Sequence, residues 1–92
     1  SDSTPLEREF TVASELGLHA RPAGQFVRLA GRFSAEISVS AEGEWVSATS
    51  VLSLLSLAAS QGTRLRIRAC GIDAEEAIEA LGQLLESPSE YV

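Results

Sequence analysis

The chain has 92 residues, so we expect one domain over 1–92, with one modest core (ordered over about 8–86) and frayed ends. A hydrophobic fraction of 45% excludes a disordered chain, and a net charge of −6 argues against general nucleic-acid binding. Because Cys70 is the single cysteine and no signal peptide or bilayer-spanning stretch stands out, we expect a cytoplasmic domain without disulfide, zinc site, cofactor or membrane insertion.

The first third of the chain predicts a strand and a helix. β-forming residues alternate loosely over 7–14, which turns Phe10 and Val12 inward. A loop follows, and from 20 to 31 the apolar residues recur at helical spacing. Pro22 falls in the first turn of this helix, where its missing N–H matters least. The expected buried face consists of Ala23, Phe26, Val27 and Ala30.

The middle of the chain predicts a hairpin and a second helix. Apolar residues alternate cleanly over 35–41, and the turn "EGE" leads into a strand that begins at Trp45. A helix then follows, with Thr49 or Ser50 as its N-cap and Gly62 as its stop signal. Its apolar positions are Val51, Leu54, Leu55 and Ala58.

The last third predicts a strand and a third helix. In "TRLRIRA" (63–69) every second residue is an arginine, and we expect these arginines to pair with acids or to stay solvated, because no aromatic residues alternate with them as base stacking requires. Asp73 and Glu76 have the spacing of a capping box at the start of the helix. Its expected buried face is Ala74, Ala77, Ile78, Leu81 and Leu85. The segment 87–92 is expected to be a frayed tail.

These elements follow the order strand, helix, strand, strand, helix, strand, helix. Alternating strands leave one face of a sheet for helices and the other for solvent. The expected fold is therefore α+β, an open-faced two-layer β-sandwich of βαββαβα topology. Its four-stranded antiparallel sheet would be covered on one side by three helices.

The one histidine of the chain, His19, stands in "GLHARPAG" at or near the N-cap of the first predicted helix. Partial positive charge on the N–H groups there favours a neutral imidazole and attracts an anion bound to the ring. Arg21 adds a guanidinium, Pro22 stiffens the turn, and Gly17 permits close approach of another segment. The pattern indicates a histidine that holds a phosphoryl group, whereas a lone histidine at a helix start is more often a cap or a solvated residue.

"GLHARPA" at 17–23, "SVLSLLSLAASQG" at 50–62 and the order of elements between them resemble one family. It is the histidine-containing phosphocarrier (HPr) family of the bacterial phosphoenolpyruvate-dependent sugar phosphotransferase system, and the resemblance covers about 8–86. It implies that Nδ1 of His19 accepts a phosphoryl group from enzyme I and passes it to IIA domains of sugar permeases. The chain would then be a carrier and not an enzyme. Arg21 would contact the phosphoryl group, with support from Gly17, Ala20 and Pro22.

The same resemblance implies regulation and docking. Ser50 matches the serine that the HPr kinase/phosphorylase modifies, although its plainer interpretation is an N-cap. The start of the first helix and the middle helix would lie side by side and face partners. The expected docking residues are Ala20, Gly24, Arg28, Val51, Leu52 and Leu55, of which Leu55 is equally well explained as core.

Departures from the family pattern leave the branch and the partner affinity open; besides the three that follow, Gly31 replaces a frequent basic residue and Ser53 a frequent glycine. Leu16 stands where a small polar residue is frequent, Thr49 where lysine is common, and Ala58 where glycine is frequent. The alternatives are a carrier of the sugar branch, a carrier of the nitrogen-related branch, and a regulatory module that binds a transcription factor or a kinase. A monomer that docks alternately with two partners is the expected state.

Overall fold

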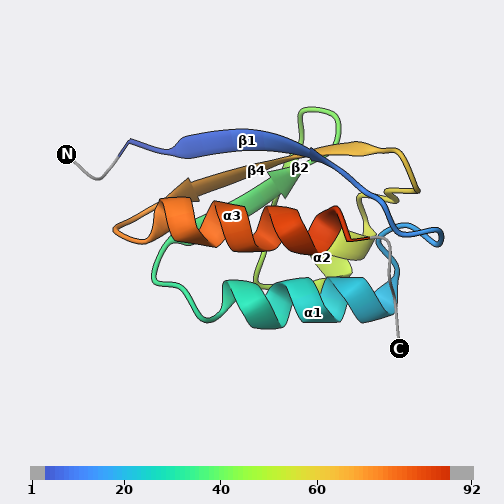
Figure 1. The fold of residues 1–92 in the computed structure, drawn as a ribbon, viewed down its shortest axis with the longest axis horizontal. Coiled ribbons are helices and arrows are strands. Elements are labelled where there is room, and N and C mark those ends of the chain that lie inside the picture. Colours follow the sequence, from blue (N-terminus) through green and yellow to red (C-terminus); the bar gives the residue numbers. More distant parts are fainter. Residues whose placement is uncertain (1–3, 88–92) are drawn as a thin grey trace.

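The computed structural model describes residues 4–87 and contains four strands and three helices (Figure 1). The order predicted from the sequence is confirmed. The elements are β1 (Leu6–Thr11), α1 (Ala20–Ala30), β2 (Glu36–Ser40), β3 (Trp45–Ser47), α2 (Val51–Leu55), β4 (Arg64–Cys70) and α3 (Ala74–Leu85).

The four strands form one antiparallel sheet in the order β1-β4-β2-β3. The register places Arg68 of β4 between Glu7 of β1 and Ser38 of β2. The helices lie on one side of this sheet, and the other side is open (Figure 1). The expected open-faced sandwich is therefore confirmed. β4, although it is the last strand in the sequence, occupies the interior of the sheet beside β1.

The core lies between the sheet and the helices, as alternation in the strands requires. Leu65 and Ile67 of β4 are fully buried, and Phe26 of α1 packs into the same core. The predicted buried face of α3 is confirmed, since Ala74, Ala77, Ile78, Leu81 and Leu85 are all buried. Burial of a large aliphatic or aromatic side chain is worth about 1.5–3 kcal/mol, so these few residues carry much of the fold's stability.

The open side of the sheet carries the three arginines of β4, and they are paired as expected. Arg66 lies 3.2 Å and Arg68 3.4 Å from the carboxylate of Glu7, while Arg64 lies 4.0 Å from that of Glu9. Arg68 also stacks 4.0 Å from the ring centre of Trp45. Exposed pairs of this kind contribute about 0–1 kcal/mol each, so they neutralise the face more than they stabilise the fold.

The middle helix is much shorter than predicted. α2 ends at Leu55, whereas the sequence predicted an end near Gly62. Ser56 and Leu57 form a turn, and Ala58 has a φ of +53°, the left-handed conformation that stops a helix. The chain is then turned toward the loop before α1, where the carbonyl of Ala59 accepts a hydrogen bond from the N–H of Leu18 at 3.0 Å. This contact between distant segments overrides the apolar spacing that favoured a longer helix.

The predicted capping box at Asp73 and Glu76 is wrong. Asp73 is the N-cap residue of α3, but its side chain makes no hydrogen bond to that helix. Its two carboxylate oxygens instead accept the backbone N–H groups of Ser34 and Ala35, each at 2.9 Å. The carboxylate therefore ties the start of α3 to the connection between α1 and β2.

Other boundaries differ from the sequence predictions by a few residues. β1 ends at Thr11, three residues before the predicted limit, although Val12 still faces the core as expected. Phe10 is half-buried, with its ring against Gly82. Within residues 4–87, no helix has the length and apolar character needed to cross a membrane. Most of the predicted tail, 88–92, lies outside the described residues.

Candidate phosphohistidine site

Two turns, together with hydrogen bonds to the segment after α2 and to the end of α3, hold the loop before α1. The N–H of Gly17 donates to the carbonyl of Ser14 at 3.0 Å, which closes a β-turn with Glu15 and Leu16 at its centre. The N–H of His19 donates to the carbonyl of Gly17, also at 3.0 Å. The side chain of the intervening Leu18 is buried. The backbone that leads into His19 is therefore anchored on both sides.

Gly17 is at a position that excludes a side chain. Its φ is +75°, which is the left-handed region, and a Cβ there would collide with the carbonyl oxygen of Ala59 and lie 2.8 Å from Cα of Ser60. The close approach expected at Gly17 is thus confirmed. A residue with a side chain would force apart the loop before α1 and the segment after α2.

His19 is the N-cap residue of α1, with an extended backbone (φ −90°, ψ −169°). Its carbonyl accepts the N–H of Ala23 at 2.9 Å, while its imidazole does not cap the helix. The N–H groups of Ala20 and Arg21 lie in the first turn, where a helix provides no acceptor, and Pro22 has no N–H. Two backbone donors with partial positive charge therefore directly follow His19 in the chain.

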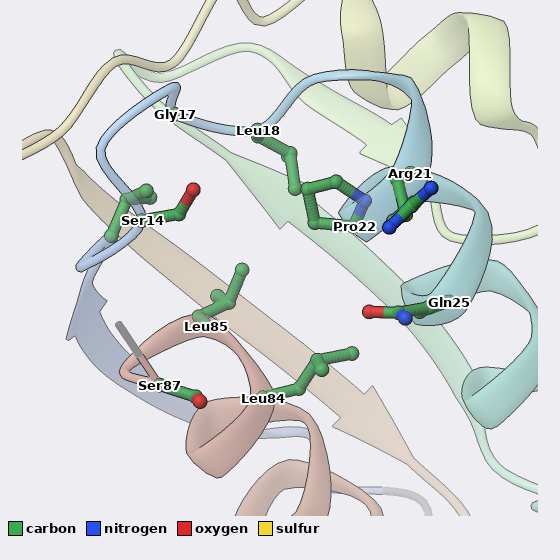
Figure 2. Close-up of a pocket in the computed structure, with 10 residues that line it drawn as sticks. Ser14, Gly17, Leu18, Arg21, Pro22, Gln25, Leu84, Leu85 and Ser87 are labelled. Atoms are coloured by element: carbon green, nitrogen blue, oxygen red, sulfur yellow. The ribbon is translucent and has the colours of Figure 1, made fainter. Parts of the chain in front are cut away.

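Arg21 and Gln25 lie one turn apart on α1 and border a small cavity (Figure 2). Leu84, Leu85 and Ser87, at the end of α3, form the opposite wall. The cavity has a volume of about 30 Å³, enough for one or two water molecules. His19 does not line this cavity, and it is half-buried at the start of α1.

The charge around the site is opposite to that of the whole chain. Residues 16–35 contain three arginines, and all thirteen acidic residues of the chain lie elsewhere. Residues 45–63, which include α2, carry no charge, and α2 packs against α1. Among residues 4–87, no carboxylate lies within 4 Å of the guanidinium of Arg21, Arg28 or Arg32. α1 and the residues that flank it are therefore positively charged, and the neighbouring α2 is uncharged.

The expected docking residues divide into exposed and partly buried ones. Ala20 and Arg28 are exposed, and Leu52 is 78% exposed on α2. Gly24 is half-exposed on α1. Val51 and Leu55 are half-buried and pack against the core, so each also stabilises the fold.

Ser50 is the N-cap residue of α2. Its hydroxyl oxygen accepts the N–H of Ser53 at 3.2 Å, and its backbone is extended. The N-cap interpretation is confirmed, and the side chain is half-buried. The oxygen that a modifying enzyme would use is therefore also the acceptor of the capping hydrogen bond.

Comparison with protein-family models matches residues 6–87 to the PTS HPr component phosphorylation site. The chain belongs to the HPr family. The phosphocarrier protein HPr of Xylella fastidiosa (strain Temecula1) is 42% identical over 82 residues, which cover 89% of this chain and 92% of that protein. The family resemblance inferred from the sequence is thereby confirmed.

Solved HPr-family structures have the same fold. The phosphocarrier protein HPr from Bacillus anthracis superposes with a TM-score of 0.85 at 39% identity, covering 89% of this chain and 98% of the other. The Bacillus subtilis protein Crh, solved as a dimer with a swapped domain, gives 0.72 at 40% identity, covering 78% and 83%. A phosphocarrier protein and a catabolite-repression protein thus have the same architecture as this chain.

The sequence did not reveal three features of the site. Ala59 and Ser60, which press on Gly17, are more than forty residues away in the chain, so no local pattern marks the contact. The exposure of Leu16, at 72%, depends on the turn it occupies. Gln25, one helical turn after Arg21, could have been found from its i+4 spacing.

Proposed function

We propose that this chain is a cytoplasmic phosphocarrier that takes a phosphoryl group from enzyme I onto Nδ1 of His19 and delivers it to IIA domains of sugar permeases. In each step a nitrogen or other nucleophile attacks phosphorus, and the electron pair of the broken bond stays on the donor atom. His19 is the acceptor in the first step and the leaving group in the second. The chain holds the group between partners and catalyses no reaction on a small substrate.

The observation that carries this proposal is the position of His19 at the N-cap of α1 in an HPr-family chain. The N–H groups of Ala20 and Arg21 have no acceptor within the helix and can donate to phosphoryl oxygens. The guanidinium of Arg21 adds a charged donor. Because residues 16–35 contain no carboxylate, no general base from this segment would direct water at the phosphohistidine.

The same residues favour partners with an acidic, partly apolar docking surface. Arg21, Arg28 and Arg32 provide charge that no nearby carboxylate in residues 4–87 neutralises. Leu52 provides exposed apolar area beside them on α2. Such a surface speeds association with an acidic partner, and the effect falls as the salt concentration rises. A monomer that meets two partners in turn is the state we propose, to be checked by light scattering.

The decisive experiment is phosphorylation by phosphoenolpyruvate and enzyme I, followed by intact-protein mass spectrometry. We expect one acid-labile phosphoryl group on the wild-type protein and none on H19A. S56A, which changes an exposed residue after α2, is the control and should be labelled as the wild type is. Labelling of H19A, or no labelling of the wild type by enzyme I of either the sugar or the nitrogen-related type, would refute the proposal. The relative rates with the two types assign the branch.

A second role, regulation through Ser50, is favoured by its place at the start of α2 within the docking face. A phosphate there suits the helix dipole and adds about −2 charge, which would repel an acidic partner. S50D keeps an N-cap acceptor and should lower the rate of phosphoryl uptake, whereas S56D should lower it much less. Equal rates for the two variants would count against regulation at Ser50. If the chain is instead a regulatory module, pull-down should recover a partner whose binding changes with S50D.

A further inference from the structure

We propose that Leu16 is a specificity-determining contact, whose side chain enters an apolar recess on the phosphoryl-donating partner. The inference rests on the proposed function and goes beyond it, because it names a residue that selects the donor and describes the surface that the donor must present. It assigns the role to an exposed leucine that takes no part in holding the phosphoryl group.

Leu16 is a large apolar side chain that is exposed at a position where polar residues are usual. Within residues 4–87 the exposed large apolar side chains are Leu6, Leu16, Leu52 and Ile72, and Leu16 is 72% exposed. It lies at the centre of the β-turn closed by Ser14 and Gly17, where polar residues are ordinarily favoured. Leu18, two residues later, is the side chain that anchors the loop in the core. Because most of its side chain is in solvent, Leu16 contributes little apolar burial to the fold.

Leu16 is close enough to His19 along the chain to lie within the interface that the phosphoryl donor makes. Leu16 precedes His19 by three positions, so the two Cα atoms are at most about 11 Å apart. A standard interface covers about 800 Å² on each protein, which corresponds to a radius of about 16 Å if it is circular. Phosphoryl transfer brings the reacting atoms of the two proteins to about 3–3.5 Å. An interface of this size that is centred on His19 therefore covers Leu16 as well.

The charges on either side of Leu16 define what the donor must offer. Leu16 is the first residue of the acid-free segment 16–35, and Glu15 immediately precedes it. A complementary donor surface thus has an apolar recess for Leu16, carboxylates toward Arg21 and Arg28, and no carboxylate facing Glu15. A donor with polar or charged groups in place of the recess would be rejected. Leu16 would displace water from those groups and offer them no hydrogen bond in return.

Ile72 provides a matched control for exposure. It is 85% exposed in the turn between β4 and α3. β1 ends beside Arg64, the first residue of β4, and leads there into the loop before α1. Ile72 follows Cys70, the last residue of β4, at the other end of that strand. The six residue steps of β4 span about 20 Å, which places Ile72 beyond the expected interface radius. Figure 1 shows the start of α1 and the turn before α3 at opposite ends of the molecule.

The test is steady-state phosphorylation by enzyme I and phosphoenolpyruvate, with wild type, L16S, L16N and I72S as the varied substrate. We expect both Leu16 variants to raise KM about 5- to 20-fold, because a leucine contact is lost, while kcat changes less than twofold. I72S should match the wild type in both constants. Thermal melts of all four proteins should agree, since both positions are exposed.

The outcomes separate this inference from the proposed function. If enzyme I does not phosphorylate the wild type at His19, the proposed function fails. If it does, but L16S and L16N have the KM of I72S, the contact role of Leu16 is refuted while the carrier role stands. A change confined to kcat, or to the rate at which isolated phosphohistidine hydrolyses, would also refute it, because Leu16 would then act on the loop and not on the partner.

Discussion

The two ends of the sheet are held together by different chemical groups. At the His19 end, most bonds between segments join backbone groups: Leu18 N–H to Ala59, and Val12 paired with Gly62 and Thr63, at 2.8–3.0 Å. Side chains add two bonds there, from Gln61 Nε2 to the carbonyl of Ala13 at 3.1 Å and from the N–H of Thr11 to the carboxylate of Glu86 at 3.3 Å. At the opposite end, the carboxylate of Asp73 binds two backbone N–H groups. Both ends also have a glycine with positive φ pressed against another segment, Gly17 at one and Gly71 at the other.

The difference shows how a small domain keeps side chains available for function. At the end where the proposed function has His19 meet partners, mainly main-chain groups and a missing side chain hold the loop, and the side chains of Leu16, Ala20 and Arg21 remain exposed. Where no partner is expected, a charged side chain is used as a structural clamp. Each end also exposes one large apolar residue, Leu16 or Ile72, so exposure alone does not identify a contact residue.

Substitution of Gly17 and of Gly71 should have the largest effect on stability and should show how the two ends of the sheet differ in function. A Cβ at Gly17 meets Ala59 and Ser60, and one at Gly71 lies 2.8 Å from Cα of Ala35. With the unfavourable φ added, G17A and G71A should each lower the free energy of unfolding by about 2–4 kcal/mol, measured with urea. G17A should also slow phosphoryl uptake at temperatures where it is folded, whereas G71A should not.

Gly24 is the control for these variants. It has a helical backbone in α1, and a Cβ added there would meet no other segment within 4 Å. G24A should therefore raise the free energy of unfolding by about 0.5–1 kcal/mol. If G17A were as stable as G24A, the close packing of the loop on the segment after α2 would not exist in solution.

Removal of the clamp should have the next largest effect. D73A deletes the acceptor for the N–H groups of Ser34 and Ala35, and Ala35 is buried, so we expect a loss of about 1.5–3 kcal/mol. E76A tests the capping box that the sequence predicted and should cost about 0.5 kcal/mol, the value of one charge near a helix start. Equal losses in urea denaturation would favour the capping box over the clamp.

Replacement of the strained Ala58 after α2 by glycine should have the smallest effect on stability. Unlike the changes above at Gly17, Gly71 and Asp73, it should stabilise the fold. Ala58 has a φ of +53°, which glycine adopts without a steric penalty. A58G should raise the melting temperature, with a gain of about 0.5–1 kcal/mol. A80G, in the interior of α3, should lose a similar amount. A loss in A58G would contradict the left-handed conformation.

Sequence patterns predicted the elements that local spacing determines. The buried face of α3 and the alternating arginines of β4 follow from periods of 3.6 and 2, and both were correct. The position of His19 at the N-cap of α1 and of Ser50 at that of α2 followed from the same logic. The family could be inferred because its two motifs stand at these helix starts.

The errors arose where distant segments decide the conformation. The apolar spacing of 51–58 favours a longer helix, but the left-handed Ala58 and the bond from Leu18 to Ala59 end it early. Asp73 has the sequence context of a cap, but the two N–H groups of Ser34 and Ala35 are better partners than one in its own helix. Neither contact leaves a mark in the local sequence.

The interior position of β4 has a consequence for synthesis of the protein on the ribosome. β1 and β2 are both made before β4, yet they do not pair with each other, because β4 lies between them. The segment that supports Gly17 and Leu18 also precedes β4 by a few residues. A nascent chain that ends before residue 64 therefore has no complete sheet. His19 gains its supporting frame only after Ala59 and Ser60, about forty residues later in the chain, and then β4 have been made.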